Sequence, residues 1–187
     1  MWAAMSTTPI PATDPGMRLL FPRTEIAARV EALAREIEHD YAGRELLLVG
    51  ILKGSFLFIA DLARALNIPA SVDFVRIASY GSDSRSSGIV EIRKDLEMPI
   101  RGRHVLIIED IVDSGYTLEA LCNRLLLREP ASLRVCTLVD KQAERATAVA
   151  VDYIGFTMDS GFIVGYGLDH DERFRTLPDI YLMQAGN

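Results

Sequence analysis

The chain has 187 residues, with 20 basic and 26 acidic side chains and a net charge of -6. That length is about one domain's worth and can bury a sizeable core, so the fold needs neither disulfides nor a structural metal. The acidic balance argues against a nucleic-acid binder, and no apolar run approaches the ~20 residues that span a bilayer, so a cytoplasmic enzyme with no membrane partner is expected.

The first part of the chain divides into a leader and a helix. Residues 1–16 are rich in Pro, Thr, Ser and Ala without periodicity, which predicts a flexible leader ahead of one domain over residues 17–187. Thr24 is the expected N-cap of a helix. Behind it, apolar residues recur at the spacing of one helix face: Ile26, Val30, Leu33 and Ile37.

Strands and helices then alternate along the chain. Short apolar runs predict strands at Leu46–Leu52, Ser71–Ile77, 89–92, His104–Ile108 and Arg134–Val139, with helices at Ser55–Leu66 and Thr117–Leu127. This order predicts an α/β fold with a mainly parallel central sheet flanked by helices. Because ligands bind beyond the carboxyl ends of such strands, the chemistry is expected just after them. Both cysteines, Cys122 and Cys136, are predicted to be buried reduced thiols.

The segment after residue 108 combines two features. A turn with Ser114, Gly115 and Thr117 opens a predicted helix, where converging backbone N–H groups, the helix dipole and two hydroxyls would bind a phosphate. Directly before it, Glu109 and Asp110 follow a buried strand. Two carboxylates would repel phosphate, so they are expected to face hydrogen-bond donors such as ribose hydroxyls, or a Mg²⁺ ion.

This pattern resembles the phosphoribosyl pyrophosphate signature of the type I phosphoribosyltransferases. The resemblance implies that family's fold, with a small hood for the base. It implies that the loop around Tyr116 binds the 5-phosphate, that Glu109 and Asp110 hold the ribose and contact the metal, and that Asp113 manages the N7 proton of a purine.

Other segments resemble the hypoxanthine–guanine phosphoribosyltransferases, and the likeness covers roughly residues 17–182. The loop with Lys53 and Gly54 (GILKGSF) corresponds to one that binds pyrophosphate and contains a cis peptide bond before the lysine. Arg175 matches an arginine on the pyrophosphate. Ser79 and Tyr80 open the polar stretch 79–88, which corresponds to the lid over the reacting centre.

Base recognition is expected from two segments near the end of the chain. Lys141 follows a predicted strand in LVDK, where the resemblance implies that its ammonium binds the purine O6. In FIVGYGLD, Phe162 matches the residue that stacks on the base, Ile163 follows it in the base site, and Asp169 matches a carboxylate that holds Mg²⁺ and pyrophosphate. These motifs together imply purine salvage, in which phosphoribosyl pyrophosphate and hypoxanthine or guanine give IMP or GMP.

Two alternatives stay open at this point. The chain could use adenine, xanthine, orotate or uracil instead, although the Lys141 and Phe162 segments favour a 6-oxopurine. It could also be a regulator that keeps the fold and binds RNA or DNA, which the acidic balance opposes. The resemblance implies a homodimer or a homotetramer, and the residues rank neither these two states nor hypoxanthine against guanine.

Overall fold

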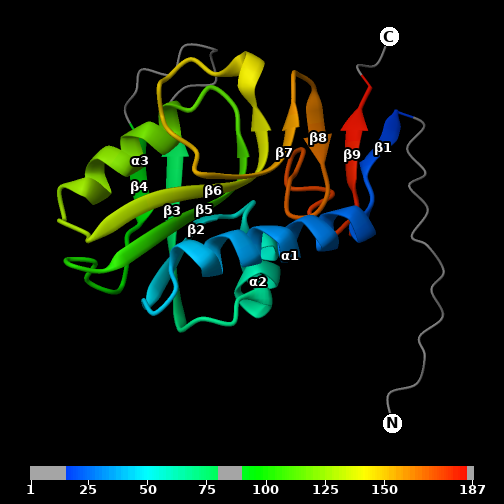
Figure 1. The fold of residues 1–187 in the computed structure, drawn as a ribbon. Coiled ribbons are helices and arrows are strands. Elements are labelled where there is room, and N and C mark those ends of the chain that lie inside the picture. The colour runs from blue at the N-terminus through cyan, green and yellow to red at the C-terminus, as the bar shows by residue number, and fades with distance from the viewer. Residues whose placement is uncertain (1–15, 80–89, 185–187) are drawn as a thin grey trace.

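The computed structural model describes residues 16–79 and 90–184. Within these ranges the chain forms two sheets with helices packed around the larger one, as Figure 1 shows. The helices are α1 (Arg23–Asp40), α2 (Phe56–Ala65), α3 (Tyr116–Leu126) and the short 3-10 helix η1 (Gln142–Glu144). None of the described helices is long and apolar enough to cross a membrane.

The larger sheet has six strands in the order β4-β3-β2-β5-β6-β7. They are β2 (Leu46–Leu52), β3 (Ala70–Ser79), β4 (Val90–Lys94), β5 (His104–Val112), β6 (Ser132–Lys141) and β7 (Tyr153–Met158). Every neighbouring pair is parallel except β3 with β4. This arrangement confirms the predicted α/β fold with a mainly parallel sheet.

A smaller antiparallel sheet stands beside the β7 edge, at the right of the molecule in Figure 1. It joins β1 (Met17–Phe21), β9 (Ile180–Met183) and β8 (Phe162–Val164) in that order. Two hydrophobic cores cover the two faces of the larger sheet. One contains α1 and α2 and continues to Ile163 and Ile180 of the smaller sheet, and the other contains α3. The carboxyl ends of β2, β5 and β6 therefore meet at one edge of the molecule.

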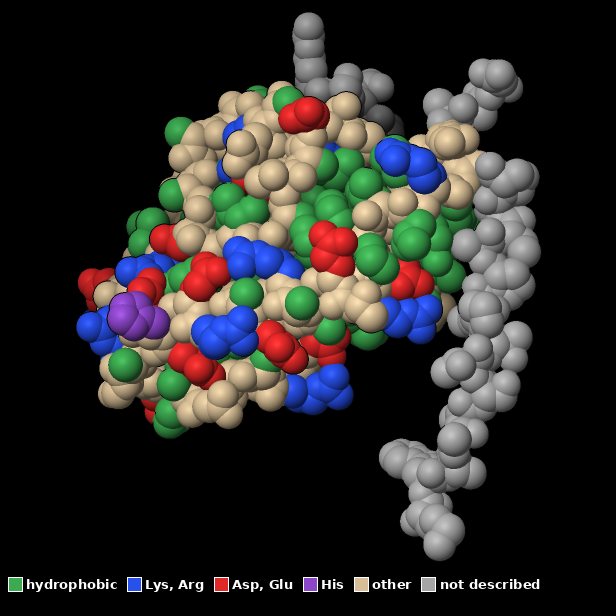
Figure 2. Space-filling view, turned by 45° about the vertical axis from the view of Figure 1, so that its right-hand side comes forward, with side chains coloured by type: hydrophobic (Ala, Val, Ile, Leu, Met, Phe, Trp, Pro, Cys, Tyr) green, Lys and Arg blue, Asp and Glu red, His purple; other side chains and the backbone are tan. Residues whose placement is uncertain are grey.

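Charged side chains are mixed on the surface. On the face drawn in Figure 2, Lys and Arg side chains alternate with Asp and Glu side chains, and no continuous basic stripe crosses this face. A nucleic-acid backbone would require such a stripe.

The predicted start of the first helix was wrong. The helix begins at Arg23 with Pro22 as its N-cap residue, so Thr24 lies inside the first turn. The capping acceptor comes from the far end of the chain, because the Asp179 carboxylate accepts the Arg23 backbone N–H at 2.7 Å. The same carboxylate binds the Arg23 guanidinium at 3.1 and 2.9 Å. Arg23 holds the pKa of Asp179 below its usual value, chiefly through these hydrogen bonds.

Two further strand predictions need correction. The strand expected to end at Ile108 continues to Val112, because β5 keeps pairing with β6, with Glu109 opposite Thr137. The acidic pair therefore lies inside a strand. No strand was predicted for β1, β7, β8 or β9. Of these, β1 and β9 pair with each other across almost the whole length of the chain.

Candidate active site

The loop between β5 and α3 has the geometry of a phosphate cradle. Gly115 has φ of +86° and precedes the first residue of α3, so its left-handed backbone turns the chain into the helix N-terminus. A cavity of about 120 Å³ opens at this loop, lined by residues that include Glu109, Asp113, Ser114, Gly115 and Thr117. Tyr116 is the first helical residue and is half-exposed. The Ala146 N–H donates to the Ser114 carbonyl at 2.9 Å and fixes the loop from behind.

The acidic pair lies at the same edge without a cationic partner. Neither Glu109 nor Asp110 forms an ion pair with a basic side chain among the described residues. Burial, together with the adjacent Asp110 charge, raises the pKa of Glu109 well above its usual value. The Asp110 carboxylate packs against Gly54, because a Cβ on that glycine would lie 1.7 Å from Asp110 Oδ2. The pair thus carries charge that an incoming group must compensate.

The loop after β2 contacts both neighbouring segments. The Leu52–Lys53 peptide bond is cis, as the family resemblance implied. The Lys53 ammonium lies 2.9 Å from Glu172 Oε1. Gly167 approaches so closely that a Cβ there would lie 2.0 Å from the Gly54 carbonyl oxygen. Glycine at position 167 therefore allows the two loops to touch, and glycine at position 54 makes room for the Asp110 carboxylate.

The segment Gly165–Asp179, called the C-terminal loop here, brings the other predicted ionic residues to this edge. The Arg175 guanidinium binds Asp169 Oδ1 at 2.7 Å and donates to the Gly167 carbonyl at 2.8 Å. The Glu172 backbone N–H donates to Asp169 Oδ2 at 2.9 Å. Arg175 Nε is buried and has no hydrogen-bond partner among the described residues.

Residues not predicted from the sequence anchor this loop. Tyr166 has φ of +50° and is buried, and its hydroxyl donates to Asp61 Oδ2 on α2 at 2.6 Å. Since α2 starts directly after the Lys53–Gly54 loop, the hydrogen bond fixes both loops to one helix. The glycines on either side of Tyr166 were a sequence signal for a tight turn, but nothing in the sequence pointed to Asp61.

The predicted base-site residues lie at three places along the edge. Lys141 ends β6, and its nearly buried ammonium lies 3.3 Å from Asp113 Oδ2. Phe162 exposes half of its surface and contacts His170 edge-on, with ring centroids 5.2 Å apart. The Ile163 side chain is instead buried in the core, so its expected place in the base site is not on the surface. Ser79 ends β3, and Tyr80 lies outside the described residues.

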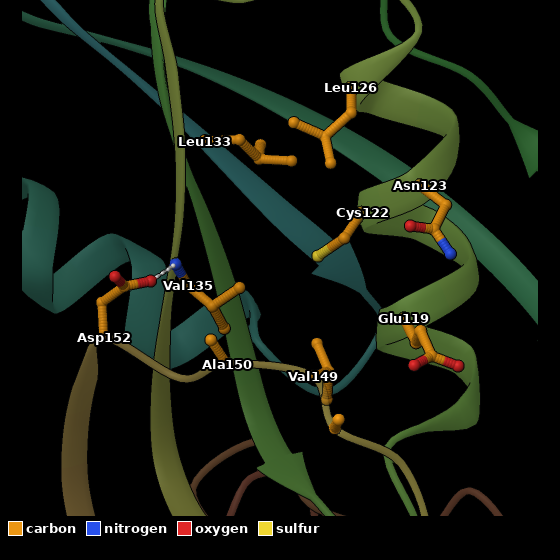
Figure 3. Close-up of a pocket in the computed structure, with 10 residues that line it drawn as sticks. Glu119, Cys122, Asn123, Leu126, Leu133, Val135, Val149, Ala150 and Asp152 are labelled. Atoms are coloured by element: carbon orange, nitrogen blue, oxygen red, sulfur yellow. Dashed lines mark hydrogen bonds between the residues drawn. The ribbon is translucent and has the colours of Figure 1, made fainter.

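A separate cavity of about 310 Å³ lies between α3, β6 and residues 148–152, away from this edge (Figure 3). Burial raises the pKa of its Cys122 thiol to about 11, which keeps the thiol protonated. Its Asp152 carboxylate accepts the Val135 N–H at 2.8 Å. Cys122 is half-buried rather than fully buried as predicted, whereas Cys136 is fully buried, and both are free.

Comparison with known proteins assigns the family. Residues 20–171 match the phosphoribosyl transferase domain. The chain is 47% identical over 164 residues to the hypoxanthine phosphoribosyltransferase of Salmonella typhimurium, which covers 87% of this chain and 92% of that protein. The chain belongs to the phosphoribosyltransferase family.

Two further relatives place this phosphoribosyltransferase among the hypoxanthine-type enzymes. It is 48% identical over 165 residues to the hypoxanthine-guanine phosphoribosyltransferase of Mycobacterium avium, covering 85% of this chain and 81% of that one. The crystal structure of a hypoxanthine-guanine phosphoribosyltransferase from Bacillus anthracis superposes with a TM-score of 0.86 at 38% identity, covering 89% of this chain and 98% of that one.

Proposed function

We propose that this phosphoribosyltransferase acts in purine salvage. It transfers the 5-phosphoribosyl group from phosphoribosyl pyrophosphate to hypoxanthine or guanine and releases pyrophosphate. The observation that carries the proposal is the meeting of the Gly115 phosphate loop, the acidic pair and the Lys53–Gly54 loop at one sheet edge. These three features match the three parts of the donor substrate.

Each part of the donor has complementary groups. The 5-phosphate binds in the cradle formed by residues 113–117, where the N-terminus of α3 and the Ser114 and Thr117 hydroxyls supply donors. Glu109 and Asp110 accept hydrogen bonds from the two ribose hydroxyls. Lys53 and Arg175 provide positive charge for pyrophosphate, which competes with their present carboxylate partners.

The reaction replaces the C1–O bond of the ribose by a C1–N9 bond and removes one proton from the base. The C1–O bond of the ribose breaks, and pyrophosphate leaves with the electron pair. N9 of the purine forms the new bond to C1, while the N7–H bond breaks and its proton passes to the Asp113 carboxylate. Lys141, which lies beside Asp113, donates to O6 and so selects a 6-oxopurine over adenine, whose 6-amino group is itself a donor. Phe162 stacks on the base.

A divalent cation fits the donor set at this edge. Among the described residues no cluster of three or more acidic, His or Cys side chains could hold a metal alone. Mg²⁺ is commonly held by one or two carboxylates together with substrate phosphates, which matches this sparse set. Glu109, Asp110 and Asp169 would hold it. A cation bound there supplies charge neutralisation for the departing pyrophosphate.

A direct assay tests the function. Purified protein with phosphoribosyl pyrophosphate and Mg²⁺ should convert hypoxanthine, guanine or both, as followed by ultraviolet absorbance, and should leave adenine and uracil unchanged. Xanthine serves as the informative fifth base, since it also carries O6. Turnover of adenine or uracil in preference to both 6-oxopurines would contradict the assignment, as would the absence of turnover with every base.

We also propose that the enzyme is a homodimer or a homotetramer. Large apolar side chains stand exposed on the described surface, including Leu19 and Leu127 at 50% and 85% exposure, and burial in a subunit contact would remove this apolar surface from water. Light scattering coupled to size-exclusion chromatography distinguishes the two states. A monomer across the micromolar range would refute the proposal.

A further inference from the structure

Lys141 lies between two carboxylates, and only one of them has a role in the proposed reaction. Its side chain is 7% exposed, and its ammonium is 3.3 Å from Asp113 Oδ2 and 3.5 Å from Glu144 Oε2. Glu144 is the last residue of η1 and was not singled out by the sequence. A nearly buried ammonium needs a counter-ion to stay charged, so Lys141 depends on these two carboxylates.

The position of Glu144 is fixed by the segment that follows it. Arg145 turns away to bind the buried Asp140 carboxylate and donates to the Val149 carbonyl at 2.9 Å. The Ala146 N–H donates to the Ser114 carbonyl at 2.9 Å, which ties the segment after η1 to the phosphate loop. Glu144 is therefore carried by backbone that is anchored on both β6 and the β5–α3 loop.

The two carboxylates also interact with each other. A hydrogen bond with the Asp113 carboxyl, followed by partial desolvation and the Asp113 charge, raises the pKa of Glu144, while Lys141 opposes the shift. Asp113 and Lys141 are the charged groups that face Glu144 among the described residues. One ammonium thus serves two acids that repel each other when both are ionised.

We infer that Glu144 is a positioning residue for base proton transfer, holding Lys141 and favouring proton uptake by Asp113. This inference rests on the proposed function. When the N7–H bond breaks and the proton joins the Asp113 carboxylate, Lys141 loses the negative charge of Asp113. Glu144 then remains as its counter-ion, so the nearly buried ammonium stays paired and directed at O6. Before transfer, Glu144 shares the Lys141 ammonium with Asp113, so Asp113 does not hold that ammonium alone.

The test compares Glu144→Gln with wild type across pH. We expect kcat to fall about tenfold, less than the 10²–10⁴-fold typical of removing a general base. We expect the acid limb of the pH profile of kcat/KM for the base to move to lower pH, since the remaining acid is paired more strongly with Lys141. The KM for phosphoribosyl pyrophosphate should stay unchanged, and Glu144→Asp, which keeps the charge, should recover part of the rate.

Glu97→Gln is the matched control, because Glu97 pairs with Lys94 at the same i,i+3 spacing, 3.0 Å apart, outside the site. It should leave kcat and the pH profile unaltered. A Glu144→Gln enzyme whose kcat and pH profile overlay those of active wild type would overturn the inference and leave the proposed function intact. Wild type inactive with every base would instead remove the proposed function. Thermal unfolding of each variant verifies that the fold is retained.

Discussion

The carboxylates at the end of β5 and those of the C-terminal loop occupy the same edge in opposite electrostatic states. Glu109 and Asp110 have no cationic partner among the described side chains, and the pKa of Glu109 is raised by burial and by its neighbour's charge. In the C-terminal loop Asp169 pairs with Arg175, and Glu172 pairs with Lys53. Glu109 and Asp110 therefore have no partner that compensates their charge, whereas Asp169 and Glu172 are already paired with cations.

The difference separates acids that have no cationic partner in the fold from acids whose ion pairs support the fold. An unpaired, partly buried acidic pair costs stability and is retained where a ligand uses it. The ion pairs of the C-terminal loop hold that loop in one conformation. Their cations can exchange a carboxylate partner for an anionic ligand. Asp179, at the end of the C-terminal loop, is the most structural of these acids, because it caps α1 and binds Arg23.

The largest effect is expected from removing the unpaired acids. The double variant Glu109→Ala, Asp110→Ala should lower kcat/KM for phosphoribosyl pyrophosphate, with a loss of several kcal/mol of transition-state stabilisation. Hydrogen bonds to charged groups are worth ~1.5–3 kcal/mol each. Steady-state kinetics measure this loss. The companion variant Glu109→Gln removes a like-charge repulsion, so its free energy of unfolding should not fall. A folded double variant with near wild-type kcat/KM would remove both carboxylates from the site.

Asp179→Asn should affect stability rather than catalysis. The loss of charge-assisted hydrogen bonds to Asp179 should lower the free energy of unfolding by roughly 1.5–3 kcal/mol at pH 7. Because the folded pKa of Asp179 is lowered, its contribution is complete above the unfolded value of about 3.9 and is lost as pH falls through the folded value. Urea unfolding should therefore show a gap between wild type and variant that is constant from pH 7 to about pH 5 and shrinks below about pH 4.

Two results would contradict this account of Asp179. The first is a gap in unfolding free energy that persists unchanged at low pH, which would mean that the carboxylate charge contributes nothing. The second is a marked rise in KM for phosphoribosyl pyrophosphate at pH 7 with stability unaltered, which would place Asp179 in the substrate site rather than at the helix cap.

The smallest effect is expected from Glu172→Gln. Glu172 binds the Lys53 ammonium and also lies 3.4 Å from Arg175 Nη2, so it competes with an incoming pyrophosphate for both cations. Its removal should lower the KM for phosphoribosyl pyrophosphate by a factor of a few, since exposed ion pairs are weak. The change in kcat should be no larger than this factor. Initial rates at varied substrate concentration measure it. An increased KM would show that Glu172 orders the loop rather than blocking it.

The sequence by itself determined the sheet, its helices and the phosphate loop. These depend on short-range rules: apolar runs predict β2, β5 and β6, and a Gly–helix junction predicts the cradle at Gly115. The acidic pair was found for the same reason, because its two residues are adjacent in the chain. The end of β5 was misplaced, since its pairing with β6 extends it beyond the apolar run, and the edge strand β7 was not predicted.

The tertiary structure alone decided which distant groups meet. Asp179 replaces the predicted Thr24 cap from 156 residues away, and Asp61 holds Tyr166 across 105 residues. Glu144 reaches Lys141 locally, at i,i+3 spacing, but the two meet Asp113 only because β6 lies beside β5. Such partners leave no periodic or motif signal, because a charge or a hydroxyl at one position is compatible with many environments. The packing of the sheet and helices selects one of them.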